Sequence, residues 1–416
     1  MDSNHSALHR PAGWLQTSGA FFLHFLSLGF AVFPLQTHLR QVHSPPTASL
    51  IASVIPIAGL LTLFMFGFAE RRSWTKYPGR LLLVGAIAAG VLQCTLGWQL
   101  ANTFSGRNIL PGFLETALCL LALACAHACC MNLLNHLALA NLGSHAYSAR
   151  AAGSAGYMVA ILATAALLSD EQMVIDYHLF LAAASATAHI LFVAAMLLTD
   201  RQPNVPELSS NRSVEPVSAP ASASDRLPKD EVTPNPWRWR ALILLVSMTS
   251  FCEGAFGLYS HEFLTTKYGD LGYYLFAVCI LLETVLLMCL PFLPKIRKQL
   301  LFVGPLGWLL LLSGCLIAQA GWPIFGTLAL AMALNCPFQV SCNENAYALR
   351  PRITGLAAIA LAQTAGVFCS QWASAILNRF VPLNSNLPPW TILWSISLCI
   401  ATAGLVLAVV IRKSND

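Results

Sequence analysis

Charged side chains are scarce in this sequence. Only 10% of its 416 residues are Asp, Glu, Lys or Arg, whereas 56% are hydrophobic. A soluble domain carries about 25% charged residues, and so few charges cannot cover the surface of a soluble fold of this size. Because lipid requires an apolar exterior, the composition excludes an ordinary soluble protein and indicates a membrane protein.

Sequence signatures of metal sites, catalysis and export are also missing. The 13 cysteines fall inside apolar stretches, without a Cys-x-x-Cys pair near histidines in a polar loop, so we interpret them as packing residues. There is no His-Glu-x-x-His and no Gly-x-Ser-x-Gly motif. We therefore expect no enzymatic activity, catalytic residue, metal or cofactor. The apolar segment from Trp14 to His38 is long for a signal peptide, and we interpret it as the first span.

Twelve apolar segments are long enough to cross a bilayer as helices, which takes about 20 mostly apolar residues. They do not alternate polar and apolar residues, as the strands of a membrane barrel do. The sequence therefore predicts an all-α polytopic membrane protein with 12 transmembrane helices. The predicted spans are 14–37, 48–68, 81–102, 112–137, 151–169, 177–199, 239–262, 271–293, 301–319, 322–346, 354–377 and 389–411.

The basic residues are distributed unevenly between the two sides of this predicted topology. With the N-terminus in the cytoplasm, nineteen of the 23 Lys and Arg residues fall on the cytoplasmic side, as the positive-inside rule requires. The remaining four are Arg40, Arg107, Lys267 and Arg379. We therefore predict a multi-pass protein of the bacterial cytoplasmic (inner) membrane, with both termini in the cytoplasm.

One long polar stretch, from Thr199 to Pro236, divides six predicted spans from six. Its content of Pro, Ser and Ala and its lack of large apolar residues are typical of a disordered linker. We predict an N-terminal six-helix half (1–199), a cytoplasmic disordered linker (200–236) and a C-terminal six-helix half (237–416).

A short internal echo favours a duplication of the two halves. Ala-Tyr-Ser-Ala-Arg follows the fourth predicted span at 146–150, and Ala-Tyr-Ala-Leu-Arg follows the tenth at 346–350. Parallel six-helix halves are the plan of the major facilitator fold, whose substrate site lies between the halves near the middle of the membrane.

Polar side chains inside the predicted spans are candidates for function, because a charged side chain at mid-helix costs about 2.5–3.5 kcal/mol on insertion. Glu283 lies near the middle of the eighth span and Glu253 lies in the seventh. Burial favours the neutral acid, which suits a proton carrier, although a structural hydrogen bond between helices is the alternative. His24, His127 and His189, in the first, fourth and sixth spans, suit either proton transfer near neutral pH or ordinary helix contacts.

The tenth predicted span is the most polar one. Asn335, Phe338 and Gln339 stand at positions i, i+3 and i+4, so they share one helix face. An amide beside an aromatic ring suits a ring-bearing or hydroxylated solute. Glu344 and Asn345 lie near the cytoplasmic end, where gating and simple solvation explain them equally well.

The loop between the second and third predicted spans contains Gly67, Glu70, Arg71 and Arg80. It resembles the loop motif of the major facilitator superfamily, in which Gly-x-x-x-Asp-Arg precedes a further Gly and basic residues. Here the acid, Glu70, stands one place earlier than in that pattern. The resemblance implies that acid–base pairs bridge the cytoplasmic ends of helices and contribute to gating; the alternative is plain positive-inside charge.

The segment 149–159, Ala-Arg-Ala-Ala-Gly-Ser-Ala-Gly-Tyr-Met-Val, resembles the nucleoside:H⁺ symporter family of the major facilitators. That family opens its fifth span with Arg-x-x-Gly-Thr/Ser-x-Gly-aromatic. The eighth span agrees, because Glu283-Thr284 followed by Leu290-Pro291-Phe292 is similar to the family's Glu-Thr…Pro-Phe-Phe segment. Cys336-Pro337-Phe338 adds to the resemblance in the tenth span.

The resemblance implies a set of substrate-binding residues in the fifth, eighth and tenth spans. Gln339 stands where the family has an aspartate; glutamine keeps the hydrogen bonds but cannot carry a proton. Proton coupling therefore falls to Glu283 or Glu253. The expected substrate-binding residues are Arg150, Ser154, Tyr157, Glu283, Asn335, Phe338 and Gln339.

The predicted function is secondary active transport of a small polar solute, with a nucleoside favoured, by alternating access and with proton coupling. The expected partners are this solute, H⁺ and the lipid bilayer, without nucleic acid, and we expect a monomer. The alternatives are a major facilitator permease for a sugar or aromatic acid, a transport-inactive membrane sensor, and a membrane-embedded enzyme.

Overall fold

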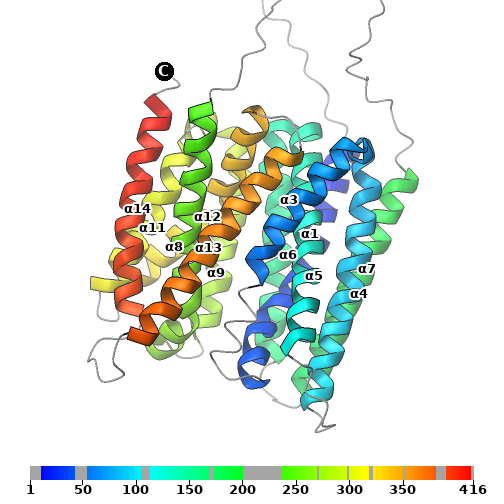
Figure 1. Ribbon diagram of the computed structural model, residues 1–416, viewed down its shortest axis with the longest axis horizontal. Helices are drawn as coiled ribbons and strands as arrows, with labels where there is room; N and C mark the ends of the chain where they lie inside the picture. Colours follow the sequence, from blue (N-terminus) through cyan, green and yellow to red (C-terminus); the bar gives the residue numbers. More distant parts are fainter. Residues whose placement is uncertain are drawn as a thin grey trace, which may run out of the picture.

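The computed structural model describes residues 11–42, 54–104, 113–167, 173–199, 236–268, 271–297, 299–317, 322–349, 353–380 and 390–413. Within these ranges the chain is helical, without strands, and twelve long helices dominate it (Figure 1). The long helices are α1 (Pro11–Val42), α3 (Ile55–Arg71), α4 (Pro78–Phe104), α5 (Phe113–Leu142), α6 (Ala146–Leu167), α7 (Met173–Thr199), α8 (Pro236–Tyr268), α9 (Leu271–Cys289), α11 (Leu300–Ile317), α12 (Trp322–Leu349), α13 (Ile353–Phe380) and α14 (Trp390–Lys413). The short elements are η1 (Trp74–Lys76), η2 (Gly143–His145), η3 (Leu290–Phe292) and α10 (Pro294–Arg297).

Each predicted span overlaps one long helix, so the predicted all-α architecture with 12 helices is confirmed. Several boundaries differ by four to six residues. The eighth span was expected to reach residue 293, but α9 ends at Cys289 and the chain continues as the 3-10 turn η3. Pro291 explains the early end, because proline has no N–H to continue the helix and its ring clashes with the preceding turn.

The surface of the bundle is strongly apolar. Seven helical stretches of the described residues are long and apolar enough to cross a membrane. Large side chains such as Phe64, Val91 and Val406 are mostly exposed, which would be unfavourable in water but suits contact with lipid. The chain is therefore an integral multi-pass membrane protein.

The helices form two six-helix halves, which agrees with the predicted fold class. In Figure 1 the N-terminal half (α1 to α7) occupies one side of the bundle and the C-terminal half (α8 to α14) the other. Each half has its own apolar core; the one in the C-terminal half includes the stacked rings of Phe256 and Trp394. The boundaries predicted for the halves stay predictions, since residues 200–235 of the predicted linker lie outside the described residues.

In both halves, a glycine of the fifth helix lies directly against the backbone of the first helix. A Cβ atom added at Gly156 of α6 would lie 2.2 Å from the carbonyl oxygen of Phe22 in α1, and one added at Gly366 of α13 would lie 2.2 Å from the carbonyl oxygen of Ser247 in α8. In both places the missing side chain lets two backbones touch, as small residues do in membrane helix pairs. The repeated contact supports a duplication.

The Ala-Tyr echo, however, does not mark equivalent positions in the two halves. Ala146 begins α6, whereas Ala346 lies in the last turn of α12. The two copies therefore belong to the fifth helix of one half and the fourth helix of the other. The five-residue similarity therefore does not support a duplication. The support comes instead from the glycine contact that the first and fifth helices make in each half.

Candidate functional site

Glu283 joins the two halves near the middle of the bundle. Its carboxylate accepts a hydrogen bond from the Ser154 hydroxyl of α6 in the other half. The Cys336 thiol of α12 also hydrogen-bonds to Glu283. The acid on α9 therefore contacts one helix of each half, α6 and α12.

The fifth helix of the N-terminal half, α6, presents three of the predicted binding residues on one face. Arg150, Ser154 and Tyr157 stand at i, i+4 and i+7, the spacing of one helical stripe. Both Arg150 and Tyr157 lie close enough to Glu283 to interact with it electrostatically. The structure thus brings together the four residues expected from the fifth and eighth spans.

Arg150 is buried inside the bundle, where the rare charged side chains of membrane helices usually lie. Its guanidinium lies 3.8 Å from the centroid of the Phe25 ring and 5.8 Å from that of Phe21, both on α1. These cation–π contacts stabilise the charge away from water. The Nη1 atom is buried without a hydrogen-bond partner among the described residues.

The second acid, Glu253 of α8, lies in an amide network of the C-terminal half. Gln339 Nε2 donates to Glu253 Oε2 at 3.3 Å, and Asn335 hydrogen-bonds to the same carboxylate. Asn335 Oδ1 in turn accepts from Trp308 Nε1 of α11 at 3.3 Å. Glu253 also interacts electrostatically with Glu283, so the network continues the polar group around that acid.

Phe338 lies apart from this polar group. Its side chain is only 1% exposed and belongs to an apolar core cluster with residues of α8, α13 and α14. A Cβ atom added at Gly304 of α11 would lie 2.3 Å from the Phe338 ring, so the ring fills a notch in the neighbouring helix. Although Phe338 shares a helix face with Asn335 in the sequence pattern, its ring packs in the core of the C-terminal half.

The loop motif connects the two halves through one residue, Glu70. At the end of α3, its Oε1 accepts from the Thr354 backbone N–H at 3.0 Å and its Oε2 from the Thr354 hydroxyl at 3.1 Å. A carboxylate at the first turn of α13 satisfies a free N–H and interacts favourably with the helix dipole. Glu70 therefore bridges the halves through a helix N-terminus rather than through a basic partner.

The other residues of the loop motif make fewer contacts than Glu70 among the interactions described. Arg71 and Arg80 are exposed, and the Arg80 guanidinium lies 4.9 Å from the centroid of the Tyr77 ring. A Cβ atom added at Gly67 would meet nothing within 4 Å. The end of the bundle that carries this loop, the upper end in Figure 1, is called the cytoplasmic end below, after the predicted orientation.

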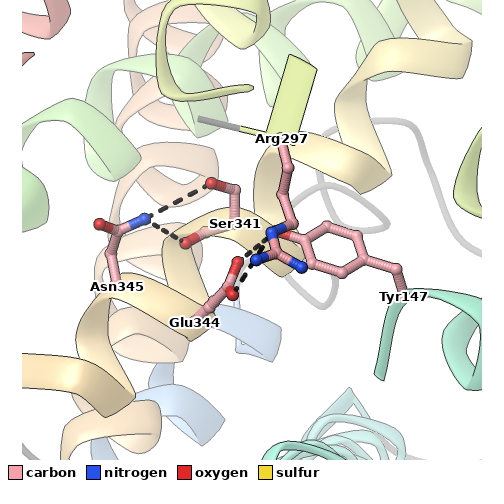
Figure 2. A network of polar contacts seen from close by, with 5 residues as sticks. All are labelled: Tyr147, Arg297, Ser341, Glu344 and Asn345. Atoms are coloured by element: carbon pink, nitrogen blue, oxygen red, sulfur yellow. Dashed lines mark hydrogen bonds and ion pairs between the residues drawn. The ribbon is translucent and has the colours of Figure 1, made fainter. Parts of the chain in front are cut away.

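A second polar link joins the halves at the cytoplasmic end (Figure 2). The Tyr147 hydroxyl of α6 donates to Glu344 Oε2 of α12 at 2.7 Å, and Arg297 Nε of α10 lies 3.7 Å from Glu344 Oε1. Asn345 turns to its own helix, where its Nδ2 donates to the Ser341 carbonyl oxygen at 2.8 Å. From the sequence, gating and solvation explained Glu344 equally well. Tyr147 could not be predicted as its partner, because the two residues are 197 positions apart.

Removing the Tyr147 hydroxyl should loosen this link. We expect Tyr147→Phe to raise hydrogen–deuterium exchange at the start of α6 and the end of α12 by about tenfold, because a hydrogen bond to a charged group contributes about 1.5–3 kcal/mol. Tyr77→Phe is the matched control, since it removes a hydroxyl from an exposed tyrosine at the same end. Equal exchange in the two variants would contradict a role of Tyr147 in holding the halves together.

The structure also brings together three histidines of different predicted spans, His24, His127 and His189. The ring of His24 lies 5.2 Å from that of His127 and 5.3 Å from that of His189, centroid to centroid. They come from α1, α5 and α7, so no sequence spacing predicts their meeting. No group of three His, Cys, Asp or Glu side chains in the described ranges is arranged to hold a metal ion.

Comparison with known proteins finds similar structures but no similar sequences. No protein-family model matches the chain, and no curated protein matches it in sequence. The crystal structure of the nucleoside transporter NupG is similar, with a TM-score of 0.59 at 16% identity over 96% of this chain and 98% of that one. A bacterial homologue of the iron transporter ferroportin, in its outward-facing state, has a TM-score of 0.67 at 13% identity over 96% and 99%. The chain thus has the major facilitator fold of these membrane transporters, neither of which is an enzyme.

Proposed function

We propose that this protein is a secondary transporter that carries a nucleoside across the membrane together with a proton. The observation that carries the proposal is the bond between Ser154 and Glu283, a buried serine and a mid-membrane acid on opposite halves of a major facilitator fold. In such folds the substrate site lies between the halves, which rock around it to expose it to either side. The fold that the chain shares with the nucleoside transporter NupG supports this choice of substrate.

The polar group around Glu283 suits the chemistry of a nucleoside. A carboxylate accepts hydrogen bonds from the two ribose hydroxyls, while side-chain amides can both donate to and accept from the edge of a base. The Arg150 donor without a partner suits a carbonyl oxygen of the base, and Tyr157 provides a flat ring. We include Arg150, Ser154, Tyr157, Glu283, Asn335 and Gln339 in the binding site, and leave out Phe338 because its ring packs in the core.

Proton coupling is assigned to Glu283, with Glu253 as the second carrier. Protonation removes a charge that is costly to move through lipid, which lets the loaded protein change its conformation. Gln339 cannot take this role, but its bond to Glu253 keeps that second acid in contact with the site.

The cytoplasmic end would open and close during the transport cycle. Glu70 with Thr354, and Tyr147 with Glu344, tie the halves together there. These ties support an arrangement closed to the cytoplasm, in which a solute enters from the opposite side. We further propose that the protein acts as a monomer in the bacterial cytoplasmic membrane, with both termini and the segment 200–236 in the cytoplasm.

Uptake of radiolabelled uridine into proteoliposomes tests the proposal. We expect uptake to rise when the outside is made acidic, because the proton gradient then drives entry, and unlabelled nucleosides to compete. The competing panel includes sugars, aromatic acids and Fe²⁺, the last because the ferroportin homologue has the same fold. If a sugar, an aromatic acid or Fe²⁺ competed and nucleosides did not, the competing solute would define the substrate class and the nucleoside proposal would be wrong. Binding in a thermal-shift screen without any flux would instead indicate a sensor.

A further inference from the structure

We propose that His24, His127 and His189 form a further proton-binding site, which lies inside the N-terminal half. The three rings belong to α1, α5 and α7, and all three side chains are buried, with at most 7% exposed. Two centroid distances, 5.2 Å from His24 to His127 and 5.3 Å from His24 to His189, place His24 between the others. The inference rests on the proposed proton coupling and names a further site for the coupling ion.

Most of the ring nitrogens in this cluster have no hydrogen-bond partner. Both nitrogens of His24, both of His127 and Nε2 of His189 are buried without one among the described residues. Buried polar groups without partners cost free energy and are rare in folded proteins. Five such atoms side by side are therefore unlike ordinary core histidines, and they indicate a ligand that binds to imidazole nitrogens.

A proton fits the spacing of these rings. A neutral imidazole has one donor and one acceptor nitrogen, whereas the protonated ring has two donors. A hydrogen bond of about 2.9 Å between two ring nitrogens separates the ring centroids by about 5 Å, close to both observed distances. A protonated His24 can therefore donate to an acceptor nitrogen on either neighbour after a small ring rotation, and the charge is shared among three residues.

The charged neighbours of the cluster link it to the proposed solute site. His24 interacts electrostatically with His127, His189 and Arg150, and Arg150 of α6 reaches the cluster past the Phe25 ring, which contacts both Arg150 and His24. On α4, which packs against α1 and α7, the buried polar group is the neutral amide of Gln93, which is bonded to Ser27 and Ala182. Arg150 is thus the charged group through which the cluster and Glu283 affect each other.

This arrangement makes the two proton sites compete. When Glu283 is ionised, its negative charge compensates Arg150, and the cluster can hold a proton. When Glu283 binds a proton, the charge of Arg150 is left uncompensated and repels a second positive charge nearby. The pair of sites therefore holds one proton at a time, and the proton moves from the cluster to Glu283 or back during the cycle.

The test separates proton-driven accumulation from exchange in proteoliposomes that contain the full chain and radiolabelled uridine. The triple variant His24→Gln, His127→Gln, His189→Gln keeps polar side chains but cannot bind a proton. With an inward gradient of about two pH units, which supports up to about 100-fold accumulation per proton, we expect the triple variant to accumulate at least about tenfold less uridine than the wild type. Uridine counterflow, which needs no net proton movement, should persist.

The control is His136→Gln, which removes another histidine of α5 whose ring contacts Tyr347 instead of the cluster. It should accumulate uridine like the wild type. Wild-type accumulation by the triple variant, or equal losses in the triple variant and the control, would overturn the histidine site while the proposed function stands. A wild type that exchanges uridine but never accumulates it would refute proton coupling, and with it both assignments.

A second measurement needs neither a substrate nor the triple variant. Nitrogen NMR of protein labelled in its histidine rings should show an imidazolium signal on acidification that each single variant, His24→Gln, His127→Gln or His189→Gln, loses. No such signal in the wild type would overturn the proposal. So would accumulation that a chelator abolishes and Zn²⁺ restores, because it would identify a metal site.

Discussion

Replacing Glu283 by glutamine is expected to abolish proton-driven accumulation of the solute. Glutamine has nearly the same shape and can still accept the hydrogen bond from Ser154, but it cannot bind a proton. One coupled proton under a gradient of about two pH units supports up to about 100-fold accumulation, since each unit is worth about 1.36 kcal/mol. The variant should therefore equilibrate uridine across the membrane without concentrating it, while its counterflow continues.

Two further variants make this result specific. Glu115→Gln removes an exposed acid of α5 and should leave accumulation unchanged. Ser154→Ala removes the donor to Glu283 but no proton-binding group, so it should weaken solute binding while coupling persists. Full accumulation by Glu283→Gln would refute the role of this acid. If Glu253→Gln alone lost accumulation, the coupling proton would belong to the seventh span instead.

Adding a single methyl group at Gly366 or Gly156 is expected to prevent correct folding. At each position the new Cβ would lie 2.2 Å from a backbone carbonyl oxygen of the facing helix, and no side-chain rotation can relieve such a contact. Overpacking costs about 1–3 kcal/mol where side chains can adjust, and here two helices must separate along their length. We expect Gly366→Ala and Gly156→Ala to yield much less monodisperse protein on size-exclusion chromatography and a lower melting temperature.

Gly257→Ala provides the matched control for the same substitution in the same fold. This glycine lies in α8, the helix that Gly366 contacts, but a Cβ atom added there meets nothing within 4 Å. Alanine is favoured over glycine inside a helix by about 0.5–1 kcal/mol, so Gly257→Ala should be neutral or slightly stabilising. If all three variants had the same stability, the close helix contacts would not matter for folding.

Much of the fold could be predicted from the sequence, because each span is a local property. A helix in lipid needs only a long enough run of apolar residues and its own backbone hydrogen bonds, and both can be recognised without knowing its neighbours. The predicted spans therefore agree with the twelve helices. The early end of α9 at Cys289, two residues before Pro291, could also have been predicted from the sequence, because the restriction that proline imposes on the backbone is local.

The candidate site was predictable in part. Polar residues inside apolar spans are rare enough to be noticed singly, and the helical spacing of Arg150, Ser154 and Tyr157 places them on one face. The same reasoning grouped Phe338 with Asn335, yet the ring packs into the notch at Gly304 instead. Helix periodicity gives the direction of a side chain relative to its own helix, but not which neighbour it faces.

The sequence by itself determined that this protein is helical, spans a membrane many times, and holds a few buried polar groups, because the cost of placing charge and unpaired backbone in lipid depends on composition alone. Only the tertiary structure decided which of those groups meet. Ser154 and Glu283 are 129 residues apart, Glu70 and Thr354 are 284 apart, and the three histidines come from three helices. Such contacts depend on how helices pack across the two halves, and that packing is set by side-chain shape and by glycines such as Gly156 and Gly366, which leave no periodic pattern in the chain.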